Sequence, residues 1–161
     1  MSQDAFARAR ADVEGRGLRV VADDLGRPWG GFLVLDEAQI DAFTAAYFPD
    51  APSTGATPLP RSPKILVVAP GQRLSWQYHH RRGELWRVLE GPVAVASGPD
   101  DVQPEPRAVA VGEQVYLDAG TRHRLIGLDG WGVVAEIWEH TDAAHPSDES
   151  DIVRVQDDFG R

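Results

Sequence analysis

Four side chains able to bind a divalent metal ion lie in two short segments of the sequence. The first segment, residues 71–91, reads GQRLSWQYHHRRGELWRVLEG and contains Gln77, His79 and Glu84, and the second contains His123. The sequence has no cysteine, which excludes thiolate metal sites, disulfides and cysteine nucleophiles. Any metal site in this protein would therefore have only nitrogen and oxygen ligands.

Polar and aromatic residues alternate around Gln77 and His79. In an extended strand, residues two apart share a face, so Arg73, Gln77 and His79 should point the same way. Trp76 and Tyr78 should then point to the opposite side. A strand whose polar side lines a pocket, and whose aromatic side is covered from outside, explains this pattern.

The chain from Lys64 onward consists of short β-type segments separated by Gly, Pro and Asp turns. The segments are KILVV (64–68), RLSWQYH (73–79), LWRVL (85–89), PVAVAS (92–97), RAVAV (107–111), QVYL (114–117), HRLIGL (123–128) and WGVVAEIWE (131–139). Short strands at this close spacing predict an all-β sandwich or barrel.

The first part of the chain contains two helix signals. Residues 3–16 predict a short helix with small and charged residues. A second helix should begin at Asp36, which can cap it, with Gln39 completing a capping box. The apolar residues of that helix recur at helical spacing and should be packing residues: Ile40, Phe43 and Tyr47.

Residues 49–63 contain five prolines and no periodicity, which predicts a long loop. We expect residues 1–63 to form a helical and extended segment packed on a β-barrel of residues 64–161. A chain of 161 residues is long enough for one structural domain with a core and too short for two ordinary ones.

The charge balance limits the classes of partner. A net charge of -9 and a pI near 4.9 disfavour binding to nucleic acid or to an anionic membrane. No apolar run reaches the roughly 18 residues of a membrane span, and the first residues carry charges where a signal peptide needs an apolar region. We therefore expect a cytoplasmic protein whose partners are small molecules or copies of itself.

The glycine and ligand spacing forms two motifs. The first is G(X)5QXH(X)4E(X)6G from Gly71 to Gly91, and the second is G(X)7GXXH, which ends at His123. Together they resemble the cupin family, whose motifs read G(X)5HXH(X)3,4E(X)6G and G(X)5PXG(X)2H(X)3N. The resemblance implies a cupin double-stranded β-helix, a jelly-roll barrel, with N-terminal helices packed outside. It also implies that one divalent ion is bound by Gln77, His79, Glu84 and His123.

The sequence departs from the cupin pattern at three positions. Gln77 replaces the first histidine, Asp118 the proline and Gly127 the asparagine, and we interpret the last two as turn positions. A Gln, His, Glu, His ligand set is the one found in the mannose-6-phosphate isomerases of the cupin superfamily. Gln77 in place of the first histidine therefore makes the sequence resemble these isomerases in particular.

Further segments are similar to the type II mannose-6-phosphate isomerase domain, the C-terminal half of enzymes that also contain a mannose-1-phosphate guanylyltransferase. They are RPWGGFLVLD, PGQRLSWQYHHRRGELWRVLEG, LDAGTRHRL and the tail DESDIVRVQDDFGR. The similarity covers roughly residues 27–35 and 64–161 and implies that the acidic tail folds over the site. The guanylyltransferase half has no counterpart in this sequence.

The resemblance implies a metal-dependent aldose-ketose isomerase that interconverts mannose 6-phosphate, or a related sugar phosphate, and its ketose through an enediolate. Zn is the first expectation for the ion, and Mn, Fe, Co or Ni are alternatives, because two nitrogens and two oxygens do not select sharply. In the family the arginine at the position of Arg82 is implicated in activity. The general base could be His80, Glu136 or Asp118, and only geometry can choose between them.

The substrate phosphate needs a cation, all the more in an acidic protein. The candidates for substrate binding are Arg73, Arg82, Arg154 and Lys64. Arg124 has the wrong parity relative to His123 and should have a structural role, whereas His140 and His145 lie outside any motif and should be exposed.

Two other functions remain open at this point. The protein could be a cupin that binds a sugar or sugar nucleotide without turnover, or a cupin isomerase of free sugars. We also expect a homodimer, because Trp76, Tyr78 and Leu89 would form an outward apolar patch that the N-terminal helices or a second subunit should cover.

Overall fold

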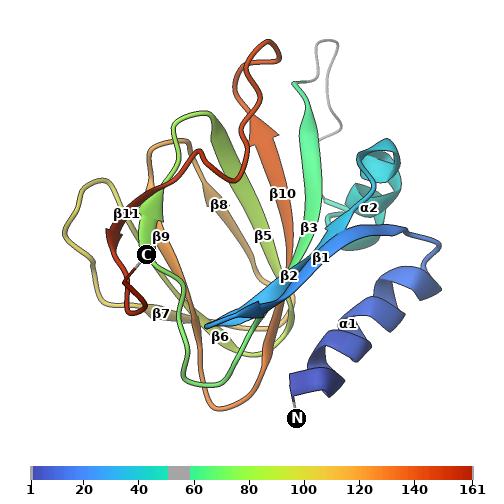
Figure 1. Ribbon diagram of the computed structural model, residues 1–161, viewed down its shortest axis with the longest axis horizontal. Helices are drawn as coiled ribbons and strands as arrows, with labels where there is room; N and C mark the ends of the chain where they lie inside the picture. Colours follow the sequence, from blue (N-terminus) through green and yellow to red (C-terminus); the bar gives the residue numbers. More distant parts are fainter. Residues whose placement is uncertain (1, 51–58, 161) are drawn as a thin grey trace.

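Two antiparallel sheets make up the body of the protein (Figure 1). The computed structural model describes residues 2–50 and 59–160. One sheet has the order β1 (Val20–Arg27), β2 (Gly30–Leu35), β3 (Arg61–Val68), β10 (Gly132–His140), β5 (Arg82–Glu90) and β8 (Gln114–Leu117). The other has the order β11 (Val153–Gln156), β4 (Trp76–Tyr78), β9 (Arg122–Gly127), β6 (Val93–Gly98) and β7 (Arg107–Val109). Each segment predicted as a strand overlaps one of these strands, which confirms the all-β expectation.

The helices lie on the outer side of the first sheet, away from the interior between the sheets (Figure 1). They are α1 (Ser2–Gly15), the 3-10 turn η1 (Glu37–Gln39) and α2 (Ile40–Tyr47). As predicted, the Asp36 side chain accepts a cap hydrogen bond, here from Ala38 N–H at the start of η1. Within the described ranges no helix is long and apolar enough to cross a membrane.

The predicted capping box does not form. Instead of binding back to Asp36, the Gln39 side chain accepts a hydrogen bond from the Arg19 N–H at 2.8 Å and donates one to the Gly17 carbonyl at 2.9 Å. Gln39 therefore joins the start of the second helical segment to the chain that leaves α1.

Two apolar cores lie on opposite faces of the first sheet. Along β3, Ile65 and Val67 pack against the helices, whereas Leu66 and Val68 face the interior of the barrel. The helix-side core contains residues of α1 and α2 such as Val13, Phe43 and Tyr47. The strand pattern of apolar residues on both faces follows from this double packing.

The hairpin of β1 and β2 was not predicted as part of the barrel sheet. Residues Val20–Arg27 have mostly exposed side chains and include two aspartates, so β1 lacks the alternation that marks a half-buried strand. β2 pairs with β3 from Gly30↔Val68 to Val34↔Lys64, and so adds residues of the first segment to the same sheet.

Strand β3 begins three residues earlier than predicted, at Arg61, and includes Pro63. Pro63 pairs with Ile137 of β10 on one side, and it lies beyond the end of the β2 pairing on the other, where no ladder donor is needed. The predicted boundary between residues 63 and 64 therefore falls inside a strand. Residues 51–58 of the predicted loop lie outside the described residues.

The three residues of the predicted outward patch do not lie together. Leu89, on the first sheet, packs against the helix-side core. Trp76, on the second sheet, is 1% exposed, and its indole N–H donates to the Asp101 carbonyl at 2.9 Å. The guanidinium of Arg122 lies 3.8 Å from the centre of the Tyr78 ring. These side chains are thus covered by α1, a loop and an arginine within the same chain.

Of the two motif departures interpreted as turn positions, Asp118 does lie next to a turn, but Gly127 is the last residue of β9. A Cβ atom at Gly127 would lie 2.1 Å from the carbonyl oxygen of Ala69. This close approach of two backbones leaves no room for the asparagine of the motif.

Replacing Phe43 by alanine should lower the free energy of unfolding by about 3–5 kcal/mol, because this fully buried ring joins α2 to the outer face of the sheet. Urea unfolding followed by circular dichroism would measure it. Val102→Ala, at a side chain 76% exposed, is the control and should change the free energy by less than about 0.5 kcal/mol. Equal values for the two variants would contradict the packing described here.

Candidate metal centre

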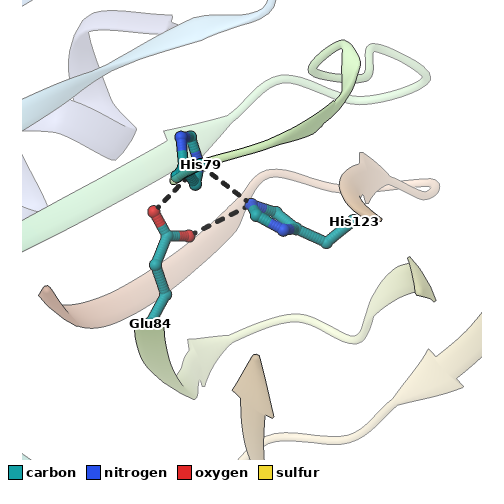
Figure 2. A group of neighbouring side chains, drawn as sticks. All are labelled: His79, Glu84 and His123. Atoms are coloured by element: carbon teal, nitrogen blue, oxygen red, sulfur yellow. Dashed lines mark hydrogen bonds and ion pairs between the residues drawn. The ribbon is translucent and has the colours of Figure 1, made fainter. Parts of the chain in front are cut away.

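Three of the four predicted metal ligands meet in the interior of the barrel (Figure 2). His79 follows β4, Glu84 lies on β5 and His123 on β9, and all three are 2% exposed. The two histidine Nε2 atoms are 3.3 Å apart, and they lie 3.3 and 3.2 Å from the two carboxylate oxygens of Glu84. The cluster therefore joins strands from both sheets.

Both imidazoles are oriented by backbone carbonyls. The second ring nitrogen, Nδ1, of His79 lies 2.7 Å from the carbonyl of Asp151, and that of His123 lies 2.9 Å from the carbonyl of Thr121. A carbonyl oxygen can only accept, so each Nδ1 donates this hydrogen bond and each Nε2 faces the cluster. Carbonyl-oriented histidines of this kind are usual in metal sites.

The protonation states of the cluster suit a cation. Burial lowers the pKa of His79 to about 4, so this ring is neutral at physiological pH. Burial would raise the pKa of Glu84, but His123 and Arg82 outweigh it and hold the pKa well below its usual range. Two imidazole nitrogens and one carboxylate thus converge in a buried space, and these residue types fit a divalent metal ion.

Gln77, the fourth predicted ligand, lies opposite His123 in the pairing of β4 with β9, so the two side chains share a face. The Gln77 amide oxygen accepts a hydrogen bond from the Ser75 hydroxyl at 2.6 Å. Gln77 also lines the cavity beside Glu84. Its role as a ligand stays a prediction.

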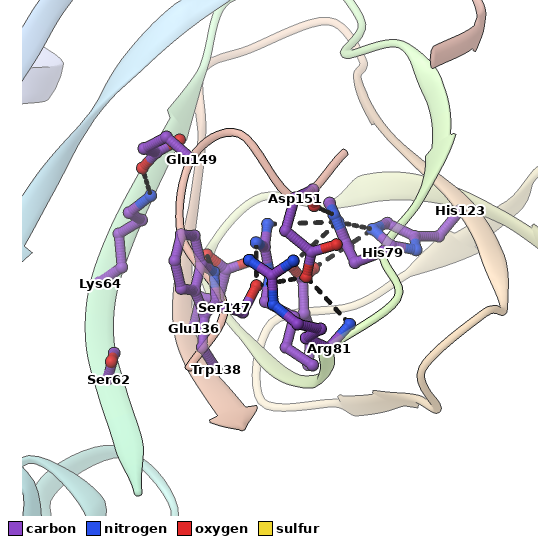
Figure 3. Close-up of polar contacts among 12 residues, drawn as sticks. Ser62, Lys64, His79, Arg81, His123, Glu136, Trp138, Ser147, Glu149 and Asp151 are labelled. Atoms are coloured by element: carbon purple, nitrogen blue, oxygen red, sulfur yellow. Dashed lines mark hydrogen bonds and ion pairs between the residues drawn. The ribbon is translucent and has the colours of Figure 1, made fainter. Parts of the chain in front are cut away.

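Asp151, in the tail, orients His79 and the backbone that follows it (Figure 3). It was not singled out from the sequence. Besides the carbonyl that binds His79, its carboxylate accepts hydrogen bonds from the backbone N–H groups of His80 and Arg81, each at 2.9 Å, and from the Ser147 hydroxyl at 2.6 Å. Burial opposes ionisation of Asp151, but these donors outweigh it and lower its pKa to about 2. The one sequence signal was its place in the family-like tail.

Arg82 contacts both the cluster and the tail. Arg82 is the first residue of β5 and is 6% exposed. Its Nε donates to Glu84 at 2.8 Å, and its Nη1 donates to the Ser147 hydroxyl at 2.9 Å and to the Asp148 carbonyl at 3.1 Å. The guanidinium carbon lies 3.6 Å from the centre of the Trp138 ring. Arg82 therefore balances the charge of Glu84 and anchors the tail.

Glu136 lies on β10, between Lys64 of β3 and Trp86 of β5. The indole N–H groups of Trp86 and Trp138 donate to its two carboxyl oxygens at 2.7 and 2.9 Å. Burial, together with the charge of Glu84, raises the pKa of Glu136 to about 8. Glu136 is therefore a buried carboxyl group that can gain or lose a proton near neutral pH.

A cavity of about 70 Å³ adjoins the cluster. Glu84 and Trp138 contribute to its wall, as do the tail residues Glu149 and Ile152. The sequence-predicted site residues that line it are Lys64, Gln77, Arg82, Glu84, Glu136 and Arg154. Arg154 pairs with Gln77 across β11 and β4, which confirms the expectation that the tail folds over the site.

Arg73 lies away from the cavity because the predicted alternation from residue 73 to 79 is broken. Residues 74 and 75 are not in a strand, so Leu74 joins the interior core and Arg73 turns outward. The Arg73 guanidinium makes two hydrogen bonds to Asp158, at 2.6 and 2.9 Å, and its side chain is 37% exposed. This position does not support the predicted role of Arg73 in substrate binding.

The two other candidate bases also lie outside the cluster. His80 is exposed, and its ring packs edge-on against Tyr78 at 5.4 Å. Asp118 is exposed, and its carbonyl accepts a turn hydrogen bond from Thr121. Geometry therefore favours Glu136 among the three candidates.

Of the residues expected outside the site, Arg124 has the predicted structural role. It is 1% exposed and donates to the Leu74 carbonyl at 2.7 Å and to the side chain of Gln103 at 3.0 Å. His145 is exposed, as predicted. The exposure predicted for His140 is wrong.

His140 is 4% exposed, because the strand alternation of β10 continues from Glu136 and Trp138 and turns it inward. Its Nδ1 accepts a hydrogen bond from the Ser147 N–H at 2.9 Å, and its Nε2 lies 2.8 Å from the Ser62 hydroxyl. Burial lowers its pKa, so His140 is a neutral residue that ties the tail to β3 and β10.

The sequence family can now be assigned. Residues 62–157 match the family model described as mannose-6-phosphate isomerase C-terminal. The chain belongs to this family. A mannose-1-phosphate guanylyltransferase of Salmonella montevideo is 27% identical over 150 residues, and the xanthan biosynthesis protein XanB of Xanthomonas campestris pv. campestris is 34% identical over 98 residues. These matches cover 92% and 61% of this chain but only 26% and 19% of the relatives.

Solved structures assign the fold to the cupins. The capsular polysaccharide assembling protein CapF from Staphylococcus aureus superposes with a TM-score of 0.53 at 18% identity, over 86% of this chain and 34% of that protein. A recombinant oxalate oxidase in complex with glycolate superposes with a TM-score of 0.55 at 20% identity, over 83% of this chain and 59% of that one. The predicted cupin barrel with external helices is therefore confirmed.

Replacing Asp151 by alanine should weaken divalent metal binding by roughly 10- to 100-fold, because the tail would no longer hold the carbonyl that orients His79. A competition titration against a chelator would measure the affinity. Asp142→Ala, in the same connection but at an exposed carboxylate, should leave it unchanged. Equal affinities for the wild type and Asp151→Ala would contradict the positioning role.

In metal-free protein, the raised pKa of Glu136 should make the wild type lose stability relative to Glu136→Gln as the pH rises. The folded state binds this proton up to a pH of about 8, whereas the ordinary pKa of the group is 4.5. The contribution of the bound proton is thus complete below about pH 4.5 and lost as the pH rises to about 8. Urea unfolding across this range would measure it, and parallel pH profiles of the two proteins would contradict the shift.

Proposed function

We propose that this protein is a metal-dependent aldose-ketose isomerase of the mannose-6-phosphate isomerase type, acting on mannose 6-phosphate or a related sugar phosphate. The observation that carries the proposal is the position of Glu136. This ionisable carboxyl group lines the same cavity as Glu84, which belongs to the cluster with His79 and His123. Aldose-ketose exchange needs both a proton carrier and a Lewis acid at one pair of carbon atoms.

His79, Glu84 and His123 would hold the ion, with Gln77 as the proposed fourth ligand. We expect Zn first, with Mn, Fe, Co or Ni as alternatives, because the donor set does not select sharply. When bound, the ion would polarise the sugar carbonyl and offset the negative charge that develops as the proton leaves carbon.

Glu136 is the proposed general base. A base works best when its pKa is close to the working pH, and burial gives Glu136 a pKa of about 8. The indoles of Trp86 and Trp138 fix the orientation of its two oxygens. Glu136 would take the proton from one substrate carbon and return it to the neighbouring carbon, while the aromatic walls exclude water.

Lys64, Arg82 and Arg154 are the proposed substrate-binding cations, since all three line the cavity. In a protein of net charge -9, local cations are needed to hold a phosphate group. Arg82 already contacts Glu84, so its proposed part in activity includes keeping that ligand ionised.

A second candidate is a cupin that binds a sugar or sugar nucleotide without turnover. It is favoured by the names of the relatives, since several are guanylyltransferases and the chain spans only about a quarter or less of their length. Turnover separates the two candidates. The homodimer and the cytoplasmic location stay predictions.

A coupled assay for fructose 6-phosphate formation from mannose 6-phosphate, with Zn, Mn, Co or Fe added, tests the proposal. We expect metal-dependent turnover that is lost in His79→Ala. Glu136→Gln should lower kcat by about 10²- to 10⁴-fold while it still binds metal, because only the proton carrier is removed.

His145→Gln, at an exposed histidine, is the control and should have the wild-type rate. Absence of turnover with every metal, combined with retained binding of the sugar phosphate, would favour the binding protein over the isomerase.

A further inference from the structure

Lys64 is a buried cation in an aromatic setting. Its side chain is 9% exposed, and its ammonium nitrogen lies 4.2 Å from the ring centres of both Phe32 and Trp138. It lies opposite Glu136 in the pairing of β3 with β10. An ammonium group taken this far from water needs an anionic partner.

The partner that the structure supplies comes from the tail. The carboxylate of Glu149 accepts a hydrogen bond from Lys64 at 2.6 Å (Figure 3). The two partners differ in exposure, because the Glu149 side chain is 62% exposed. Glu149 therefore reaches Lys64 from the solvent side of the cavity, whereas Lys64 is part of the barrel wall.

The cavity beside this ion pair is too small for a sugar phosphate. Its volume is about 70 Å³, whereas sites that enclose small organic ligands measure about 300–1,000 Å³. Three of its lining residues, Glu149, Ile152 and Arg154, belong to the tail. Admission of a substrate therefore requires part of the tail to move.

We propose that Lys64 is the centre of an anion-binding subsite, and that Glu149 occupies this subsite in the closed protein and is displaced by a phosphate group. The inference rests on the proposed function only for the source of that phosphate, a sugar phosphate. The subsite itself follows from the contacts of Lys64. Release of Glu149 opens the cavity toward the cluster of His79, Glu84 and His123.

The exchange is favourable for a simple electrostatic reason. Glu149 is already largely hydrated, so its return to water requires little further solvation. A phosphate monoester carries up to two charges and more acceptor oxygens, so it binds the buried ammonium more strongly than one carboxylate. The other tail contacts, from Arg82 to Ser147 and Asp148, need not break.

Titration of the metal-loaded full chain with inorganic phosphate, at constant ionic strength, tests the subsite without any turnover. Glu149→Gln removes the competing charge and should bind phosphate roughly 1.5- to fivefold more tightly than the wild type. Lys64→Gln should lose this binding. Glu105→Gln, at an exposed carboxylate outside the cavity wall, is the matched control and should behave as the wild type.

Hydrogen exchange of residues 147–156 supplies a second readout. Phosphate should speed exchange in this tail segment of the wild type, and Glu149→Gln should exchange faster without phosphate. Because Lys64 is buried, the Lys64→Gln variant is first checked for a cooperative unfolding transition. If this variant does not fold, the comparison of Glu149→Gln with the wild type tests the proposal.

The outcomes separate this inference from the proposed function. Equal phosphate affinity and equal exchange in the wild type and Glu149→Gln would overturn the displacement, even if the isomerase assay succeeds. Tighter phosphate binding in Glu149→Gln without any sugar isomerisation would support the subsite and count against the isomerase alone.

Discussion

The burial of Glu84 is the constraint on which the site depends. An ionised carboxylate at 2% exposure would be strongly unfavourable without partners, and the barrel provides Arg82, His79 and His123 within 3.3 Å. Each partner is in turn held by the second sheet or by the tail. The jelly roll thus brings together four groups from the end of β4, from β5 and from β9 that the sequence separates by up to 44 positions, and none of them is satisfied alone.

The charge of Glu84 also acts on the rest of the interior. Burial raises the pKa of Glu136, and the charge of Glu84 raises it further, so one carboxylate is held ionised while its neighbour keeps a proton near neutral pH. The two acidic groups therefore differ in protonation because His123 and Arg82 outweigh burial at Glu84, whereas burial outweighs the nearby cations at Glu136. The difference is the kind of arrangement on which acid-base chemistry depends.

The sequence predicted the strands after residue 64 because β alternation is a local signal, and the resemblance to the cupin motifs implied the residues of the cluster. His140 shares the strand parity of Glu136, so the same alternation would also have predicted its buried position. Arg73 shows the opposite limit, because the break at residues 74 and 75 turns its side chain outward, against the predicted alternation. Asp151 acts through long-range hydrogen bonds to backbone groups, for which the sequence carries no periodic signal.

The in-register pairing of β3, β10 and β5 has one more consequence. Lys64 is in register with Trp86 across β10, and Glu84 lies two residues further along β5, so the backbone positions of Lys64 and Glu84 are separated by roughly 9–10 Å across the sheet and about 7 Å along it. This separation is set by backbone hydrogen bonds on both sides of β10 rather than by loops. The spacing of the strands therefore sets the length of any ligand that contacts both groups. Such a ligand is selected by its length before its stereochemistry.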